Sequence, residues 1–203
     1  MKKDDSFAMI NADKYYFGIG VEKNFETAFH WYLQAAKSGN DTARTQVGLM
    51  YYNGIGTTVN YDEAFKWLNF GFGFLLRNAP ATYTLAEMYF YGRGTKQNYL
   101  RAFHLYDLAL GGGYNINAAF RLGEMCEYGY GVEVDNQLAI KYYVRAANNG
   151  NEVAMNKLGL IYETGEIVEQ DYNKARQWYF LAAQKGNAFA AAKLEELPES
   201  EDS

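Results

Sequence analysis

Paired glycines are the first feature of this sequence that suggests chemistry. Gly-x-Gly occurs four times between predicted helices, starting at Gly18, Gly54, Gly92 and Gly129. Such a pair could cradle a phosphate if it followed a strand and had a third glycine or a Gly-Lys-Ser/Thr continuation. Each pair instead follows a helical pattern and lacks both continuations, so we predict tight turns between helices.

Histidine and cysteine are the other candidates for chemistry. His30 and His104 fall at equivalent points of a repeating pattern, on a face that we expect to be solvated. The same points elsewhere hold Lys66, Lys141 and Gln177. No second ligand pairs with either histidine at helical spacing, which argues against a metal site. Cys126 takes the position of a core aromatic residue, so we expect a buried, unreactive thiol. We therefore predict no enzyme, no cofactor and no metal.

The pattern that positions these residues is a helix pair, best seen in residues 154–186. In its first half, Ala154, Leu158, Gly159 and Tyr162 share one helical face. A second amphipathic helix follows, with an apolar face formed by Ala175, Trp178, Tyr179, Ala182 and Ala183. Asp171 is suited to cap the start of this second helix, and Gly186 to end it. We call the first helix A and the second helix B.

This helix pair recurs five times. The glycine that ends helix A runs Gly18, Gly54, Gly92, Gly129 and Gly165. The alanine near the start of helix B runs Ala28, Ala64, Ala102, Ala139 and Ala175, and its cap runs Asn24, Asn60, Asn98, Asp135 and Asp171. We expect one domain over 5–197, with repeats at 5–40, 41–76, 77–115, 116–151 and 152–187. A polar capping helix at 188–197 and an acidic tail at 198–203 complete the prediction.

The pattern A-x3-L-G-x2-Y-x2-G-x-G, then D/N-x3-A-x2-W/Y-Y-x2-A-A-x2-G, resembles the Sel1-like repeat, a relative of the tetratricopeptide repeat. The resemblance covers nearly the whole chain. It implies an all-α, right-handed solenoid that serves as a bacterial adaptor or scaffold for other proteins, with no chemistry of its own. Some bacterial relatives are secreted and carry a disulfide in each repeat, and this chain lacks those cysteines.

Composition narrows the possible partners and locations. The 203 residues carry a formal net charge of −5, which argues against nucleic acid or an anionic membrane as partner. The single cysteine cannot form an internal disulfide. No signal-peptide pattern and no run of about 18 apolar residues occurs, so we expect a cytoplasmic protein with no membrane insertion. The sequence leaves the oligomeric state open.

If helix A lines the concave surface, as in tetratricopeptide relatives, its exposed positions lie nine, five, two and one residues before the glycine that ends it. We call these positions the helix-A face. The predicted partner-binding residues are Asp13, Tyr16, Leu49, Tyr52, Tyr83, Glu87, Phe90, Phe120, Glu124, Glu127, Tyr128, Asn156, Leu160 and Glu163. They include aromatic and acidic residues but no lysine or arginine. The alternative for Tyr16, Phe17, Phe90 and Tyr91 is packing against the adjacent hairpin.

Such a face suits a protein or peptide with basic and apolar anchor residues. Charge reversal at Glu124 and Glu127 is expected to weaken binding and leave the melting temperature nearly unchanged. A second possible patch comprises Phe72, Phe74 and Leu75, which could instead seal an altered junction at 69–76. A dedicated inhibitor or immunity protein is the alternative function. An enzyme or cell-wall ligand binder is a further alternative with less support.

Overall fold

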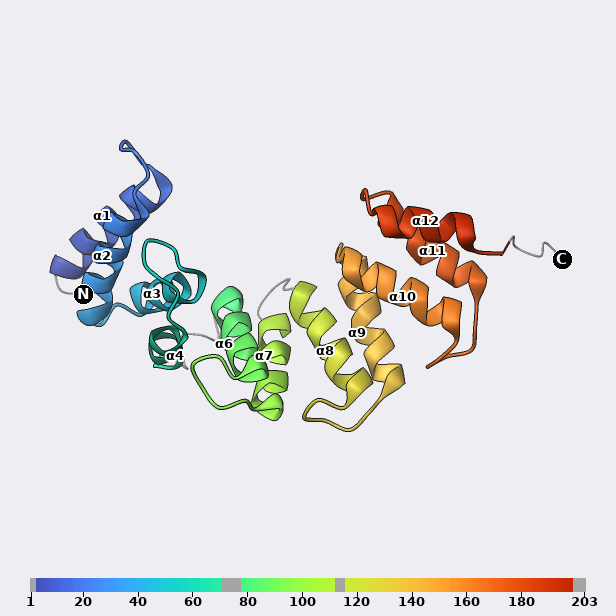
Figure 1. Cartoon of the computed structure of the whole chain (residues 1–203). Helices are drawn as coiled ribbons and strands as arrows, with labels where there is room; N and C mark the ends of the chain where they lie inside the picture. The colour runs from blue at the N-terminus through green and yellow to red at the C-terminus, as the bar shows by residue number, and fades with distance from the viewer. Residues whose placement is uncertain (1–2, 71–77, 112–115, 199–203) are drawn as a thin grey trace. The chain divides into compact units, whose positions relative to one another are not determined.

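The computed structural model describes residues 3–70, 78–111 and 116–198 (Figure 1). Over these ranges the chain forms eleven helices and no strand. The first six are α1 Lys3–Phe17, α2 Phe25–Lys37, α3 Asp41–Asn53, α4 Tyr61–Asn69, α6 Ala79–Tyr91 and α7 Tyr99–Gly111. The others are α8 Ile116–Tyr128, α9 Asn136–Asn148, α10 Glu152–Thr164, α11 Tyr172–Ala183 and α12 Ala188–Glu196. The predicted all-α fold is confirmed.

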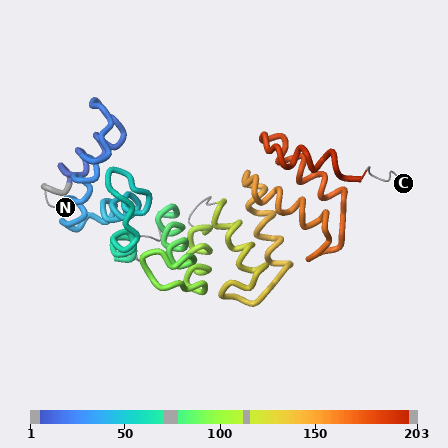
Figure 2. Tube along the Cα trace, in the orientation of Figure 1, coloured from blue at the N-terminus to red at the C-terminus, as the bar shows by residue number. Residues whose placement is uncertain are grey.

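The helices form two compact units, residues 1–112 and 113–203. In the first, the hairpins α1–α2, α3–α4 and α6–α7 follow one another, and α2 packs on α3 and α4 on α6. In the second, α9 packs on α10 and α11 on α12. Figure 2 traces this order of hairpins within each unit. Each helix A therefore contacts its own helix B, and every helix A that follows a hairpin in the same unit also contacts the helix B before it.

Asparagine and aspartate side chains begin the helices. The predicted helix-B caps are confirmed at Asn24, Asn60, Asp135 and Asp171, whose side chains accept from backbone N–H groups in the first turn. The structure adds equivalent caps for helix A of the second, third and fifth repeats and for α12. These caps are Asn40, Asn78, Asn151 and Asn187. Each such cap contributes about 1 kcal/mol to helix stability. The second, third and fifth repeats have caps on both helices, which fix where the hairpin begins and turns.

A glycine inside helix A lets the large side chain of helix B approach its backbone. A Cβ atom built on Gly159 would lie 2.5 Å from Cε1 of Tyr179, and one on Gly123 would lie 2.6 Å from Cδ1 of Tyr143. Both tyrosines are completely buried. The alternation of small and large residues seen in the sequence is thus a contact between the two helices of one hairpin.

The second glycine of the Gly-x-Gly turn joins neighbouring hairpins. A Cβ on Gly56 would lie 2.1 Å from the carbonyl oxygen of Phe25, and one on Gly94 equally close to that of Tyr61. Phe25 and Tyr61 are the first residues of the preceding helix B. Both glycines also have φ near +70°, at 67° and 68°. A side chain is excluded here by backbone conformation and by the neighbouring repeat.

Three further expectations concern single residues and one segment. Cys126 is 1% exposed, as expected. His30 and His104 are exposed, as expected for an outer face. Helix α4 ends at Asn69, followed by Phe70, which is 71% exposed. The rest of the predicted junction, with the patch residues Phe72, Phe74 and Leu75, lies outside the described residues.

Candidate protein-binding face

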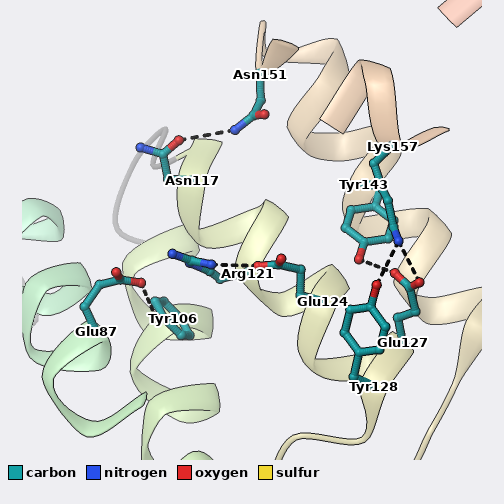
Figure 3. A network of polar contacts seen from close by, with 10 residues as sticks. All are labelled: Glu87, Tyr106, Asn117, Arg121, Glu124, Glu127, Tyr128, Tyr143, Asn151 and Lys157. Atoms are coloured by element: carbon teal, nitrogen blue, oxygen red, sulfur yellow. Dashed lines mark hydrogen bonds and ion pairs between the residues drawn. The ribbon is translucent and has the colours of Figure 1, made fainter. Parts of the chain in front are cut away.

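The helix-A face is built around buried tyrosine hydroxyls of helix B. In the fourth repeat the Tyr143 hydroxyl donates to Oε2 of Glu127 at 2.6 Å (Figure 3). In the fifth, Tyr179 donates to Oε2 of Glu163 at 2.7 Å. Because each tyrosine ring is fully buried, its hydroxyl needs an acceptor inside the hairpin. The two glutamates supply it, so their carboxylates are structural as well as surface groups.

The first and third repeats use a different acid for the same purpose. Tyr32 donates to Oδ1 of Asp13 at 2.5 Å, and Tyr106 donates to Glu87 (Figure 3). These acids lie five residues before the terminal glycine of helix A, whereas Glu127 lies two before it. Glu87 is only 9% exposed. The expectation that it stands open to a partner is wrong, because the neighbouring tyrosine buries it.

The choice of acid correlates with the small residue on helix A. Where that residue is glycine, at Gly123 and Gly159, the tyrosine hydroxyl reaches the acid four residues later. Where it is alanine, at Ala12 and Ala86, the hydroxyl reaches the very next residue. Without a methyl group the ring can lie across the helix backbone, which displaces the hydroxyl toward the following turn.

The second repeat fits the correlation because it lacks both the buried tyrosine of helix B and the acid of helix A. Leu68 stands where the other repeats have a buried tyrosine, and it contacts Gly48. Both acid positions are then uncharged, held by Leu49 and Tyr52. An acid at either position would have no buried hydroxyl to accept from. The acids of the helix-A face therefore vary together with helix B of the same hairpin.

Lysines from the following helix A complete these pairs. Lys157 donates to Oε1 of Glu127 at 2.7 Å and to the Tyr128 hydroxyl at 3.0 Å (Figure 3). Lys193 of α12 occupies the same position relative to Glu163, at 3.1 Å. The four predicted positions of the face hold no lysine or arginine, and these lysines lie at a fifth position, eight residues before the terminal glycine of helix A. Positive charge from that position offsets much of the acidity that we expected.

The pairing has consistent electrostatic consequences. Burial raises the pKa of the Tyr143 hydroxyl above its usual range, and the hydrogen bond to Glu127 raises it further. The same two causes raise the pKa values of Tyr32 and Tyr179. Burial lowers the pKa of Lys157, but hydrogen bonds to Glu127 and Tyr128 outweigh it and the net shift is upward. Neutral tyrosine and cationic lysine are therefore the stable protonation states.

Arg121 and Glu124 form a second charged pair on α8. Arg121 Nη1 lies 2.8 Å from Glu124 Oε2, and both side chains are 24% exposed (Figure 3). At the start of the same helix, Asn117 accepts from the helix-capping Asn151 at 3.2 Å (Figure 3). These contacts hold neighbouring polar groups in fixed orientations, and Glu124 remains partly accessible.

In the first compact unit an arginine from a turn enters a tyrosine cluster. Arg93 donates to the Tyr52 hydroxyl at 2.9 Å. Its guanidinium lies 4.7 Å from the ring centre of Tyr91 and 5.4 Å from that of Tyr61. Cation–π contacts of this kind stabilise the junction between the second and third repeats. Tyr52, a predicted binding residue, is thus engaged by the neighbouring turn.

Aromatic residues of the helix-A face pack mainly within their own hairpin. The ring of Phe120 lies 5.5 Å from that of Tyr143, and Tyr83 makes an equivalent contact with Tyr106. Two further rings of this face, Tyr16 and Phe90, contact helix B of their own hairpin. Tyr16 lies 5.3 Å from Phe25, and Phe90 lies 5.1 Å from Tyr99. The packing alternative is supported, but against the same hairpin.

Several aromatic and apolar residues of this face are accessible, beside the exposed polar residues Asn53 and Thr164. Tyr128 is 51% exposed and Leu160 is 40% exposed. Phe17 and Tyr91, at the same position as Tyr128 in earlier repeats, are 55% and 43% exposed. Asn156 and Leu49 are intermediate. The arrangement offers apolar contact area beside hydrogen-bonded charges, which can bind a surface but does not activate a nucleophile.

A cleft with polar side chains in its lining lies on the helix-B side. It encloses about 560 Å³, and Arg101, His104 and Asp107 contribute to its lining. Arg101 is held by the Tyr89 hydroxyl at 2.9 Å. Across the described ranges no three His, Cys, Asp or Glu side chains are placed to hold a metal ion. In the same ranges, no helix has the length and apolar character needed to cross a bilayer.

Comparison with known proteins gives the family. The Sel1 repeat matches residues 12–40, 42–70, 79–114, 116–151 and 153–187, so the chain belongs to the Sel1 repeat family. This family is typical of protein–protein interaction and generally acts as a non-catalytic scaffold. No protein with a curated function matches the chain.

Solved structures agree with this assignment. A Sel1 repeat protein from Oxalobacter formigenes is 32% identical with a TM-score of 0.80, and the match covers 94% of this chain and 74% of that one. A protective antigen of uropathogenic Escherichia coli is 28% identical with a TM-score of 0.82, over 95% of this chain. This chain spans only 40% of the antigen's length. An immunity protein from Pseudomonas aeruginosa is 23% identical with a TM-score of 0.53, over 90% of this chain and 68% of that one, which shows likeness of fold.

Proposed function

We propose that this protein is a non-catalytic binding module that engages another protein or peptide through the helix-A face. The observation that carries the proposal is the contact of the accessible Tyr128 with Lys157, which also binds Glu127. Leu160 lies one turn after Lys157 on the same helix and is accessible too. Exposed apolar side chains next to immobilised polar groups are the usual composition of a protein-binding surface. Membership of the Sel1 repeat family supports the same conclusion.

The expected partner differs from the one that charge counting suggests. Glu127 and Glu163 are each neutralised by a lysine, so net attraction for a basic segment is weak. We propose that apolar anchors of the partner contact Leu160 and the ring of Tyr128. Polar groups of the partner would then meet the charged pairs, which set the orientation of the bound segment more than its affinity.

The test is a matched pair of substitutions in the full chain. Leu160→Asp places a charge among the proposed contacts, whereas Phe180→Asp places one on α11, where Phe180 is 52% exposed. A partner captured from cell extract is identified by mass spectrometry, purified, and titrated against all three proteins. We expect Leu160→Asp to weaken binding by about tenfold or more and Phe180→Asp to leave it unchanged. Equal affinity of all three proteins would refute a role for the helix-A face.

The purified partner also allows an experiment that distinguishes a scaffold from an inhibitor. The likeness to the Pseudomonas immunity protein motivates this second candidate, although it concerns the fold. If the purified partner is an enzyme or toxin, its activity is assayed with increasing amounts of this protein. Loss of partner activity that Leu160→Asp relieves would identify an inhibitor. Unchanged activity in the bound state would identify a scaffold.

A further inference from the structure

The cleft on the helix-B side lies in the third repeat, beside the end of α4. Its walls include Asn69 of α4, Tyr89 of α6, and Arg101, His104, Leu105 and Asp107 of α7. Helix α4 has nine residues, whereas α2, α7 and α9 each have thirteen, and the cleft opens beside its last residue. None of these side chains belongs to the helix-A face, so a site here is independent of the proposed function.

The second repeat has a smaller cleft at the same repeat position, of about 300 Å³ against about 560 Å³ in the third repeat. Trp67 lines the smaller cleft at the position that Leu105 holds in the larger one. The remaining repeats also have an aromatic residue at this position, namely Trp31, Tyr142 and Trp178. The third repeat therefore lacks a ring that every other repeat has, and its cleft is the larger one.

The charges around the two clefts also differ. In the second repeat Glu63 and Lys66 pair with each other at 2.6 Å. Their equivalents in the third repeat are Arg101 and His104. The Arg101 side chain donates to the Tyr89 hydroxyl at 2.9 Å, and its guanidinium lies 5.4 Å from the centre of that ring. No carboxylate pairs with Arg101 within the described ranges. Its remaining N–H groups are therefore available to an anion.

Shape and charge together define the ligand that fits. A flat apolar group against Leu105 would take the place of the ring found in the other repeats. A carboxylate on that group would accept from Arg101, with His104 one turn further along as a second donor. Asp107 lies one turn beyond His104, and its negative charge disfavours an anion at that end of the cleft. The volume of about 560 Å³ is typical of a site for a small molecule.

We propose that this cleft binds a small aromatic carboxylate, with its ring against Leu105 and its carboxylate on Arg101. The ring completes packing that the other repeats achieve with a side chain of their own. The Tyr89 hydroxyl holds the guanidinium in place before the ligand arrives, so little of the binding energy is needed to order it.

Isothermal titration calorimetry of the full chain with indoleacetate tests the proposal. We expect one saturable site. Arg101→Gln should weaken binding by about tenfold or more, because the carboxylate loses a charged hydrogen-bond donor. Lys174→Gln is the matched control, since it makes the same change in charge at the same repeat position of the fifth repeat, and it should leave the affinity unaltered. Indoleacetamide, which has the same ring without the charge, should also bind about tenfold more weakly or worse.

Leu105→Trp tests the shape of the cleft. It gives the third repeat the side chain that Trp67 supplies in the second, so we expect unchanged helicity by circular dichroism and no measurable binding of indoleacetate. Should this variant fail to fold, the comparison of Arg101→Gln with Lys174→Gln decides the result. A short peptide with a C-terminal tryptophan carries the same ring and carboxylate, and tighter binding of that peptide than of indoleacetate would overturn the assignment to a small molecule.

Proton NMR locates the bound ring, because the chain has only two histidines. The ring-proton signals of His104 should shift when indoleacetate is added, whereas those of His30, at the same position of the first repeat, should stay in place. The variant His30→Gln assigns the two sets of signals. Absence of a saturable site, equal affinity of Arg101→Gln and the unaltered chain, or equal shifts of both histidines would overturn the proposal.

Discussion

Glu127 shows how a charged residue on a presumed binding face can be part of the fold. It accepts from Tyr143 within its hairpin and from Lys157 of the next helix A. Its side chain is only 11% exposed. A partner would therefore meet a mostly buried carboxylate whose two oxygens each already accept a hydrogen bond, which limits its contribution to affinity.

The first prediction follows from these two hydrogen bonds. Glu127→Lys should lower the free energy of unfolding by about 1–3 kcal/mol, because the buried Tyr143 hydroxyl loses its acceptor and two lysines are brought together. Urea unfolding measures the change. Glu124→Lys is the control, with an expected loss below about 1 kcal/mol for a partly exposed pair. This revises the expectation that charge reversal at both residues leaves the melting temperature nearly unchanged. Equal stability of the two variants would contradict it.

A second prediction concerns the helical glycine that faces a tyrosine. Gly159→Ala should destabilise the protein by about 1–3 kcal/mol, since the new methyl group overlaps the Tyr179 ring. Gly111→Ala provides the comparison, because no heavy atom lies within 4 Å of a Cβ at Gly111. There we expect a neutral effect or a gain of up to about 1 kcal/mol from helix propensity. Thermal unfolding of both variants gives the difference, and matching losses would show that overlap is not the cause.

The correlation between the small residue and the acid yields a rescue experiment. The third repeat has alanine followed by glutamate, Ala86 and Glu87, and its tyrosine uses that glutamate. Adding Leu160→Glu to Gly159→Ala recreates this pair in the fifth repeat. We expect the double variant to recover part of the stability lost by Gly159→Ala alone. A double variant less stable than the sum of both single changes would refute the correlation.

At the scale of elements, the turn glycines carry the contact between neighbouring hairpins. Gly56→Ala and Gly20→Ala both place a side chain at a left-handed backbone position, which costs roughly 1–2 kcal/mol. Only Gly56 has the neighbouring Phe25 carbonyl in the way. We therefore expect Gly56→Ala to lose clearly more stability than Gly20→Ala when both are unfolded with urea at low protein concentration. Equal losses would indicate that backbone conformation alone explains the glycine.

Much of the element level could be predicted from the sequence, because helix caps, apolar spacing and turn glycines are local signals. The caps at Asn24 and Asp171 and the close approach at Gly159 belong to this class. The role of Lys157 could not be predicted, since it depends on how one hairpin lies against the next. The role of Glu87 was missed because the direction of a buried tyrosine hydroxyl depends on a methyl group one residue away.

At the scale of the whole molecule, buried tyrosines distributed over the repeats predict an alkaline limit to stability. Tyr32, Tyr143 and Tyr179 have pKa values raised above the usual value of about 10. The folded state therefore keeps protons that the unfolded state releases. Their contribution is fully present below about pH 10 and is lost as the pH rises above it.

We accordingly expect phenolate absorbance to appear in two phases during an alkaline titration. The second phase, from the buried Tyr32, Tyr143 and Tyr179, should coincide with the loss of helicity measured by circular dichroism. In Tyr143→Phe the second phase should be smaller by the absorbance of one tyrosine. A single phase complete before any loss of helicity would show that the buried hydroxyls ionise in the folded protein.

The hydrogen-bonded pairs also bear on how such a chain can grow by duplication. Tyr143 and Glu127 lie within one hairpin, so copying that hairpin as a block keeps them together. Glu127 and Lys157 lie in successive hairpins, so a recombination joint between them preserves the pair only if the incoming block brings a compatible residue. Repeats of this chain are therefore exchangeable to the extent that their junction residues match, and the second repeat would need an arginine equivalent to Arg93 after it to keep the contact with Tyr52.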